Sequence, residues 1–101
     1  MDETTAFVVV DLWRVKPGKR EEVQQLLAEV GPLFRQQPGI RSVDFAHLDG
    51  DPERYLVVFR YVSREAREGF RGTDELKGTM ARLSELWDLE SPVYLGWQSG
   101  L

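Results

Sequence analysis

The stretch FVVVDLWRVK, residues 7–16, decides the fold of this chain. Strand residues alternate between the two faces of a sheet, so a strand with one face in water alternates apolar and polar residues. This stretch is apolar at both sets of positions until its last residues, which predicts a central strand covered on both faces. A single carboxylate, Asp11, interrupts it. Because a buried unpaired carboxylate is costly or becomes protonated, Asp11 needs a partner, water or a chemical task.

The segment after the turn Lys16-Pro17-Gly18 has helical periodicity. Apolar residues recur there every three or four positions, which predicts an amphipathic helix over residues 19–36. Its apolar face consists of Val23, Leu26, Leu27, Val30 and Phe34. Gly31-Pro32 predicts a kink or a division within this helix, and Gln37-Pro38-Gly39 predicts its end.

Two further strands are predicted on either side of the turn formers at residues 49–52. Residues 40–49 form the more polar strand, as suits a sheet edge. Residues 54–62 are apolar on both faces, which predicts a second central strand. The turn between the two strands predicts a hairpin.

The last third of the chain predicts two helices and a strand. Ser63 and Thr73 are favourable N-cap residues, and they predict helices over residues 64–70 and from residue 74 onward. The apolar stripe of the longer helix is predicted to contain Leu76, Met80, Leu83 and Trp87. Ser91-Pro92 then leads into a last strand, residues 93–98.

The resulting order βαββαβ predicts an α+β, ferredoxin-like fold, with a four-stranded antiparallel sheet in the order 4-1-3-2. We expect one domain over residues 1–101. The helices of this fold cover one face of the sheet only. The other face would expose a larger apolar patch than monomers usually tolerate, so we expect a homodimer that packs through this face. The apolar residues concerned are Val8, Val10, Leu12, Leu56, Val58 and Val62.

Composition excludes several classes of function. The net charge of −4 argues against nucleic acid as a partner. No apolar run approaches the ~20 residues that span a membrane, and the acidic start is unlike a signal peptide, so we expect a cytoplasmic protein. The chain has no cysteine and one histidine, which argues against disulfides, thiolate chemistry and Cys-ligated or multi-His metal sites.

Four local signatures occur in order along nearly the whole chain. They are Val15-Lys16-Pro17-Gly18-Lys19, Gln37-Pro38-Gly39-Ile40, Arg54-Tyr55-Leu56-Val57 and Ser63-Arg64-Glu65-Ala66. With these signatures the chain resembles the antibiotic biosynthesis monooxygenase (ABM) family, a branch of the dimeric α+β barrels. The resemblance implies a dimeric α+β barrel, but proteins of this fold differ widely in chemistry.

The resemblance also implies a choice between two chemistries. Some family members oxidise polyphenolic rings to quinones with O₂ and no cofactor, whereas a related branch binds and cleaves haem. The haem branch uses an Asn, a Trp and a His ligand at positions that correspond here to Asp11, Phe70 and Met80. Because the iron ligand is absent, the resemblance implies no haem degradation and no cofactor.

Two residues are candidates for acid–base chemistry. Asp11 is a candidate general base or hydrogen-bond acceptor for a phenolic substrate, since burial would raise its pKa toward a useful value. The alternative is a structural acid paired with one of the ten arginines, for example Arg60 or Arg14. His47, the only group with an unperturbed pKa near neutrality, is a second candidate base if its strand face lines a pocket. Otherwise it is solvated or hydrogen-bonded locally.

A large aromatic set predicts a pocket for a flat ligand. Trp13 shares the face of Asp11, Phe59 lies on the third strand, and the helix stripes carry Phe70, Met80 and Trp87. These five residues are the predicted ligand-binding residues, although rings are also the usual filler of small cores.

The sequence leaves three functions open. The first is an ABM-like protein that binds a small aromatic or polyketide-like molecule and oxidises a phenolic ring to a quinone. The second is a ligand-binding stress or regulatory protein without catalysis, and the third is a polyketide cyclase or isomerase. No metal site and no Ser–His–Asp or Cys–His arrangement is predicted, and whether the protein is an enzyme stays open at this point.

Overall fold

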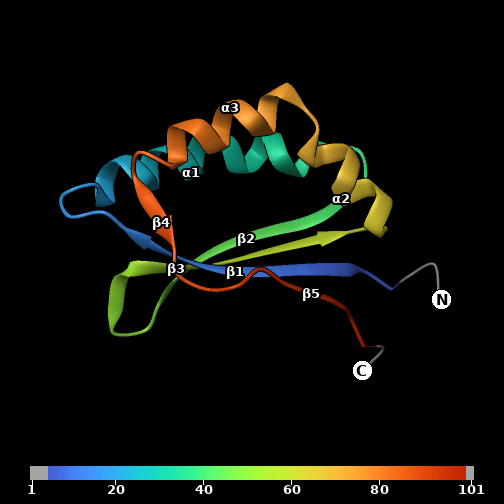
Figure 1. The fold of residues 1–101 in the computed structure, drawn as a ribbon, viewed down its shortest axis with the longest axis horizontal. Helices are drawn as coiled ribbons and strands as arrows, with labels where there is room; N and C mark the ends of the chain where they lie inside the picture. Colours follow the sequence, from blue (N-terminus) through green and yellow to red (C-terminus); the bar gives the residue numbers. More distant parts are fainter. Residues whose placement is uncertain (1–4, 100–101) are drawn as a thin grey trace.

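A computed structural model describes residues 5–99 of the chain, and its helices lie together over one face of a sheet (Figure 1). Strands β1 and β3 form the centre of this sheet. The elements in chain order are β1 (Phe7–Val15), α1 (Arg20–Arg35), β2 (Ile40–Leu48), β3 (Asp51–Tyr61), α2 (Arg64–Arg71), α3 (Asp74–Leu83), β4 (Trp87–Leu89) and β5 (Tyr94–Trp97).

The sheet is antiparallel and has the order β2-β3-β1-β4, with β5 also paired to β1. This order confirms the predicted ferredoxin-like fold, with β1 and β3 central and β2 at an edge. The sequence pattern explains this order. Strands β1 and β3 are apolar on both sheet faces, and each of them is hydrogen-bonded to a strand at both of its edges.

The fourth strand differs from the prediction. A single strand over residues 93–98 was expected, but β4 and β5 share one edge of β1, pairing with Trp13–Val15 and Phe7–Val10 respectively. Between them the chain leaves the ladder at Ser91-Pro92, where proline has no N–H to donate. The N–H of Leu12 instead donates to the Ser91 hydroxyl at 3.0 Å.

Trp87 was predicted on the apolar stripe of the last helix, and this is wrong. Helix α3 ends at Leu83, and Trp87 begins β4. The N–H of Lys16 donates to the carbonyl of Leu86 at 2.8 Å, which extends the pairing of β4 with β1 by one step. Trp87 reaches the space under the helices from the sheet edge rather than from above.

Helix α1 is continuous through Pro32, so the predicted division did not occur. Proline removes the hydrogen bond to the carbonyl four residues earlier, that of Ala28. Both Ala28 and Pro32 are exposed, and water can satisfy that carbonyl. The two predicted N-caps are confirmed: the side chains of Ser63 and Thr73 accept from the N–H groups of Ala66 and Leu76.

The core lies between the sheet and the helices. It consists of the apolar face of α1 and of alternate residues of β1 and β3, including Phe7, Val9, Val15, Tyr55, Val57 and Tyr61. The opposite sheet face has no helix over it (Figure 1), and its apolar residues Val8, Val10, Leu12, Leu56 and Val58 are only half-buried. The sequence predicted that in a monomer the helices would cover one face of the sheet and leave the other exposed.

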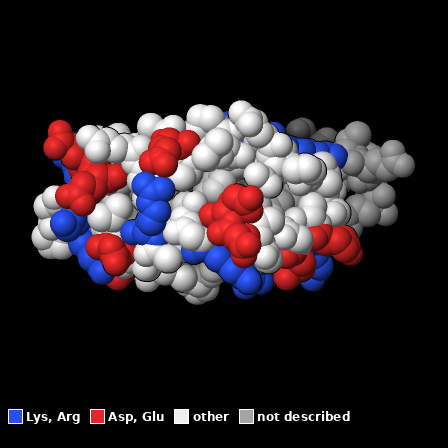
Figure 2. Space-filling model, turned by 90° about the horizontal axis from the view of Figure 1, so that it is seen from above, with Lys and Arg blue, Asp and Glu red and all other residues white. Residues whose placement is uncertain are grey.

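The surface on the helix side carries acidic and basic side chains in mixture (Figure 2). Nucleic-acid-binding proteins instead gather basic residues in a patch or stripe. No helix within residues 5–99 is long and apolar enough to cross a membrane.

Candidate active site

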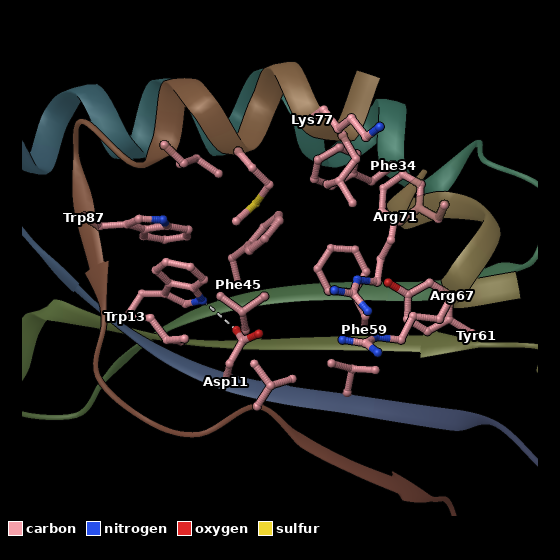
Figure 3. A pocket seen from close by; sticks show the side chains of 18 residues that line it. Asp11, Trp13, Phe34, Phe45, Phe59, Tyr61, Arg67, Arg71, Lys77 and Trp87 are labelled. Carbon is pink, nitrogen blue, oxygen red and sulfur yellow. Dashed lines mark hydrogen bonds between the residues drawn. The ribbon is translucent and has the colours of Figure 1, made fainter. Parts of the chain in front are cut away.

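A cavity of about 520 Å³ lies between the sheet and the helix layer. Alternate residues of β1 and β3 form its floor, because period-two side chains on those strands face the helices. Helices α2 and α3 form its roof, and β4 closes one side (Figure 3). The predicted residues Asp11, Trp13, Phe59, Phe70, Met80 and Trp87 all line this cavity.

Aromatic rings form two opposite parts of the wall. Trp13 and Trp87 stack with centroids 4.9 Å apart and planes 20° from parallel. Away from that stack, Phe34 lies edge-on to Phe70 at 5.3 Å, and Phe59 lies 6.0 Å from Phe70. Such walls suit a flat, largely apolar ligand. Trp87 Nε1 is buried and has no hydrogen-bond partner among the residues described.

Asp11 is the acidic residue of the cavity wall. The indole Nε1 of Trp13 donates a hydrogen bond to its Oδ1 at 2.6 Å, and Figure 3 shows this pair at the cavity floor. Burial raises the pKa of the Asp11 carboxyl, while the Trp13 hydrogen bond and the positive charge of Arg67 work against that rise. Asp11 is therefore more easily protonated than an exposed aspartate, and it is held in one orientation.

Neither arginine considered as a structural partner pairs with Asp11. Arg14 forms an ion pair with Glu90, and Arg60 pairs with Asp44 at 3.0 Å. Both arginines occupy even positions of their strands, opposite the face that carries Asp11. Trp13, two residues along the same face, is the actual partner.

Tyr61 is a polar group of the cavity wall that the predicted set missed. Burial is the main cause that raises its pKa, to about 12, and the charge of Asp11 adds to this effect. Its phenol therefore stays protonated at neutral pH, and it can donate a hydrogen bond to a ligand but not act as a base.

Three cationic residues at the cavity were also missed: Arg67, Arg71 and Lys77. Arginine and lysine usually indicate a solvated helix face. A signal was nevertheless present, because Arg67 and Arg71 are four residues apart and flank the buried Phe70, which places all three on one side of α2.

His47 does not join Asp11. It is exposed on edge strand β2 and lines a separate shallow cleft beside α1, where its ring centroid lies 6.1 Å from that of Tyr55. The cavity thus brings together six of the seven predicted residues and excludes the histidine. Their roles in binding and catalysis stay predictions. Within residues 5–99 no group of three or more His, Cys, Asp or Glu could hold a metal ion.

Comparison with known proteins shows the family of this chain. A family model described as antibiotic biosynthesis monooxygenase matches residues 6–82. The chain belongs to this family. The resemblance predicted from the four local signatures is thereby confirmed. Membership in the ABM family supports a monooxygenase-like or small-molecule-binding role.

Solved structures similar to this ABM-family protein share its fold. A protein from Mycobacterium tuberculosis is 24% identical with a TM-score of 0.73, covering 97% of this chain and 96% of its own. A protein from Shewanella oneidensis is 23% identical with a TM-score of 0.78, covering 96% and 93%. A conserved protein from Methanosarcina mazei is 19% identical with a TM-score of 0.79, covering 95% and 93%. No curated protein matches the chain.

Proposed function

We propose that this ABM-family protein binds a flat phenolic molecule in the cavity and oxidises it with O₂, without a cofactor. The observation that carries the proposal is Asp11: one half-buried carboxyl group, oriented by Trp13, on the wall of an otherwise largely aromatic and aliphatic cavity. Catalytic acids and bases are commonly found in such surroundings, where burial shifts their pKa.

The proposed reaction begins with proton transfer. The Asp11 carboxylate accepts one of the two ring-methylene protons of an anthrone-like phenolic substrate, and the resulting anion is electron-rich enough to react with O₂. In an anthrone-like substrate the ring methylene becomes a carbonyl, and its carbon gives up the four electrons that O₂ takes. One oxygen atom enters the carbonyl. The other leaves as water with the two methylene hydrogens, one of which Asp11 returns.

Other side chains of the cavity support this step by position. The aromatic walls hold the ring system flat and keep bulk water from the anion. The protonated Tyr61 and the guanidinium of Arg67 both line the cavity, and they would stabilise negative charge that develops on a substrate oxygen.

The same carboxyl group also suits a second function. An acid or base in an apolar cavity can isomerise or cyclise a polyketide-like molecule by proton transfer alone, without O₂. Asp11 would then have the same role, and only the consumption of O₂ separates the two functions.

The first test measures O₂ uptake with anthrone and with hydroquinones, for the unchanged protein and for Asp11→Asn. The substitution keeps the shape of the side chain but removes the base, so turnover should fall by ~10²-fold or more. Asp44→Asn is the matched control, because Asp44 is an exposed carboxylate on β2, outside the cavity, and turnover should be unchanged.

Three results would count against the proposal. Equal turnover of Asp11→Asn and the unchanged protein removes Asp11 from the mechanism. Product formed without O₂ uptake favours the isomerase or cyclase. Tight binding of anthrones with no chemical change over long incubation favours the ligand-binding protein.

A further inference from the structure

We infer that the ligand of this cavity carries a carboxylate, which Arg67 and Arg71 bind while the flat rings extend toward Trp13 and Trp87. The inference rests on the proposed site and names the class of ligand that it selects. It comes from an excess of positive charge at one end of a cavity that is otherwise mostly apolar.

The geometry of α2 directs both guanidinium groups to the cavity. Residues four apart lie on one side of a helix, and the buried Phe70 between them fixes that side toward the sheet. Figure 3 shows Arg67 and Arg71 reaching from α2 toward the space beside Asp11 and Phe59. The side chain of Arg67 is only 14% exposed, so its charge is largely removed from water.

These cations have little negative charge close to them. A single carboxylate, that of Glu68, lies within ion-pair distance of both, at 3.5 Å from Arg67 and 3.6 Å from Arg71. Glu68 is 58% exposed, and ion pairs of that kind contribute little. Asp11 interacts with Arg67 electrostatically, but no ion pair joins them within the described residues.

Lys77 on α3 is an exposed cation that also lines the cavity, and no ion pair of Lys77 occurs in the part of the chain that the structure describes. The whole chain has a net charge of −4, so its composition does not explain an excess of cations here. The largely buried guanidinium of Arg67 has only the exposed Glu68 as an ion-pair partner among the described residues, and a buried cation is favourable only when it is well paired. An anionic group on the ligand would supply a second partner from within the cavity.

A carboxylate suits this position best. Guanidinium groups bind planar carboxylates through two parallel hydrogen bonds, and a flat aromatic acid has one anionic end and an apolar body, as this cavity has one cationic end and apolar walls. Asp11 repels the anion and accepts hydrogen bonds, so it would turn the phenolic hydroxyl of the same ligand toward itself. The positive charge of the two arginines and the negative charge of Asp11 would together fix one orientation of the ligand in the cavity.

The test compares two ligands that differ only in this charge, anthraquinone-2-carboxylate and anthraquinone-2-carboxamide. Binding is followed by quenching of tryptophan fluorescence, since Trp13 and Trp87 line the cavity. One charge-assisted contact is worth about 1.5–3 kcal/mol, so the unchanged protein should bind the carboxylate at least about tenfold more tightly. The preference should weaken as salt is added.

The variant Arg67→Gln/Arg71→Gln should bring the ratio of the two affinities close to one, mainly by weakening the carboxylate. Arg82→Gln is the matched control, because Arg82 lies on α3 and pairs with the exposed Glu29 outside the cavity, and its ratio should equal that of the unchanged protein. If the double variant folds poorly, Arg71→Gln alone replaces it in the measurement. The Arg71 side chain is 56% exposed, so its substitution should leave the fold intact.

Equal affinity for the two ligands in the unchanged protein would overturn the inference, as would a preference that survives in Arg71→Gln and in the folded double variant. Both ligands are already fully oxidised at the central ring, so the measurement does not depend on turnover. A failure of the oxidation experiments therefore leaves this result interpretable, and a failure here leaves the proposed oxidation intact.

Discussion

The residue that most distinguishes this chain is Asp11, and the sequence alone singled it out because it is the only acid in a two-faced apolar strand. Its partner was not predicted. Ion pairing with arginine was the obvious expectation, but the alternation of strand side chains places Arg14 on the opposite face, where it pairs with Glu90. The indole of Trp13 is the nearest donor on the same face.

Replacing Trp13 by phenylalanine tests this pairing through the pH dependence of turnover. Trp13→Phe keeps an aromatic ring near Trp87 but removes the N–H that donates to Asp11. That hydrogen bond lowers the pKa of Asp11, so its loss should raise the pKa further. Activity that needs the carboxylate increases as pH rises through this pKa, and the acid limb of the profile of kcat/KM should therefore shift to higher pH.

Trp97→Phe is the matched control, because Trp97 lies on β5 and outside the cavity. Its acid limb should coincide with that of the unchanged protein. An acid limb that moves to lower pH in Trp13→Phe, or does not move at all, would show that the indole does not control the proton affinity of Asp11.

At the scale of elements, α2 shows both the strength and the weakness of prediction from sequence. Its start at Arg64 and its Ser63 cap were predicted correctly, because capping chemistry is local, and it ends one residue beyond the predicted Phe70. Its arginines were not assigned to the cavity, because their orientation depends on how the helix packs. For α3 the periodic pattern continued to Trp87, and no glycine or proline between residues 84 and 86 marked the end of the helix.

The cap of α2 can be tested by Ser63→Ala. The Ser63 hydroxyl accepts from the N–H of Ala66 at 3.0 Å, and losing such a cap usually costs about 1 kcal/mol of unfolding free energy. Urea denaturation should show this loss. Ser84→Ala is the control, because the exposed Ser84 follows α3 and caps no helix N-terminus; its effect should stay within about 0.5 kcal/mol. Equal effects of the two substitutions would contradict the assignment.

At the scale of the whole molecule, the feature that calls for an explanation is the sheet face without helices. The sequence predicted this uncovered face correctly. The two central strands are apolar on both faces, and the helices of a ferredoxin-like fold cover only one of them. We propose that a second copy of the chain covers it, in keeping with a family whose members are generally dimeric. The divided fourth strand was not predictable in the same way, since Ser91-Pro92 is equally typical of a segment that leads into one strand.

A charge at the centre of this face should separate the two copies. Val10 is half-buried on the open side of β1, and Val10→Asp places a carboxylate where two faces would meet. Analytical ultracentrifugation at micromolar concentration should show a dimer for the unchanged protein and a monomer for the variant. Leu33→Asp, on the exposed side of α1, should stay dimeric. A monomeric unchanged protein, or a dimeric Val10→Asp, would show that this face is not the interface.

The break between β4 and β5 has a consequence for aggregation. A long, straight sheet edge is a template onto which strands of other chains can add without limit, as in amyloid. One edge of this sheet is instead divided into strands of three and four residues, and the other, β2, has register shifts near both of its ends. The register shifts leave residues 42–47 as the longest regular run on the β2 edge, and the opposite edge is shorter still. Addition of foreign strands to the native fold should therefore be disfavoured most strongly at the divided edge.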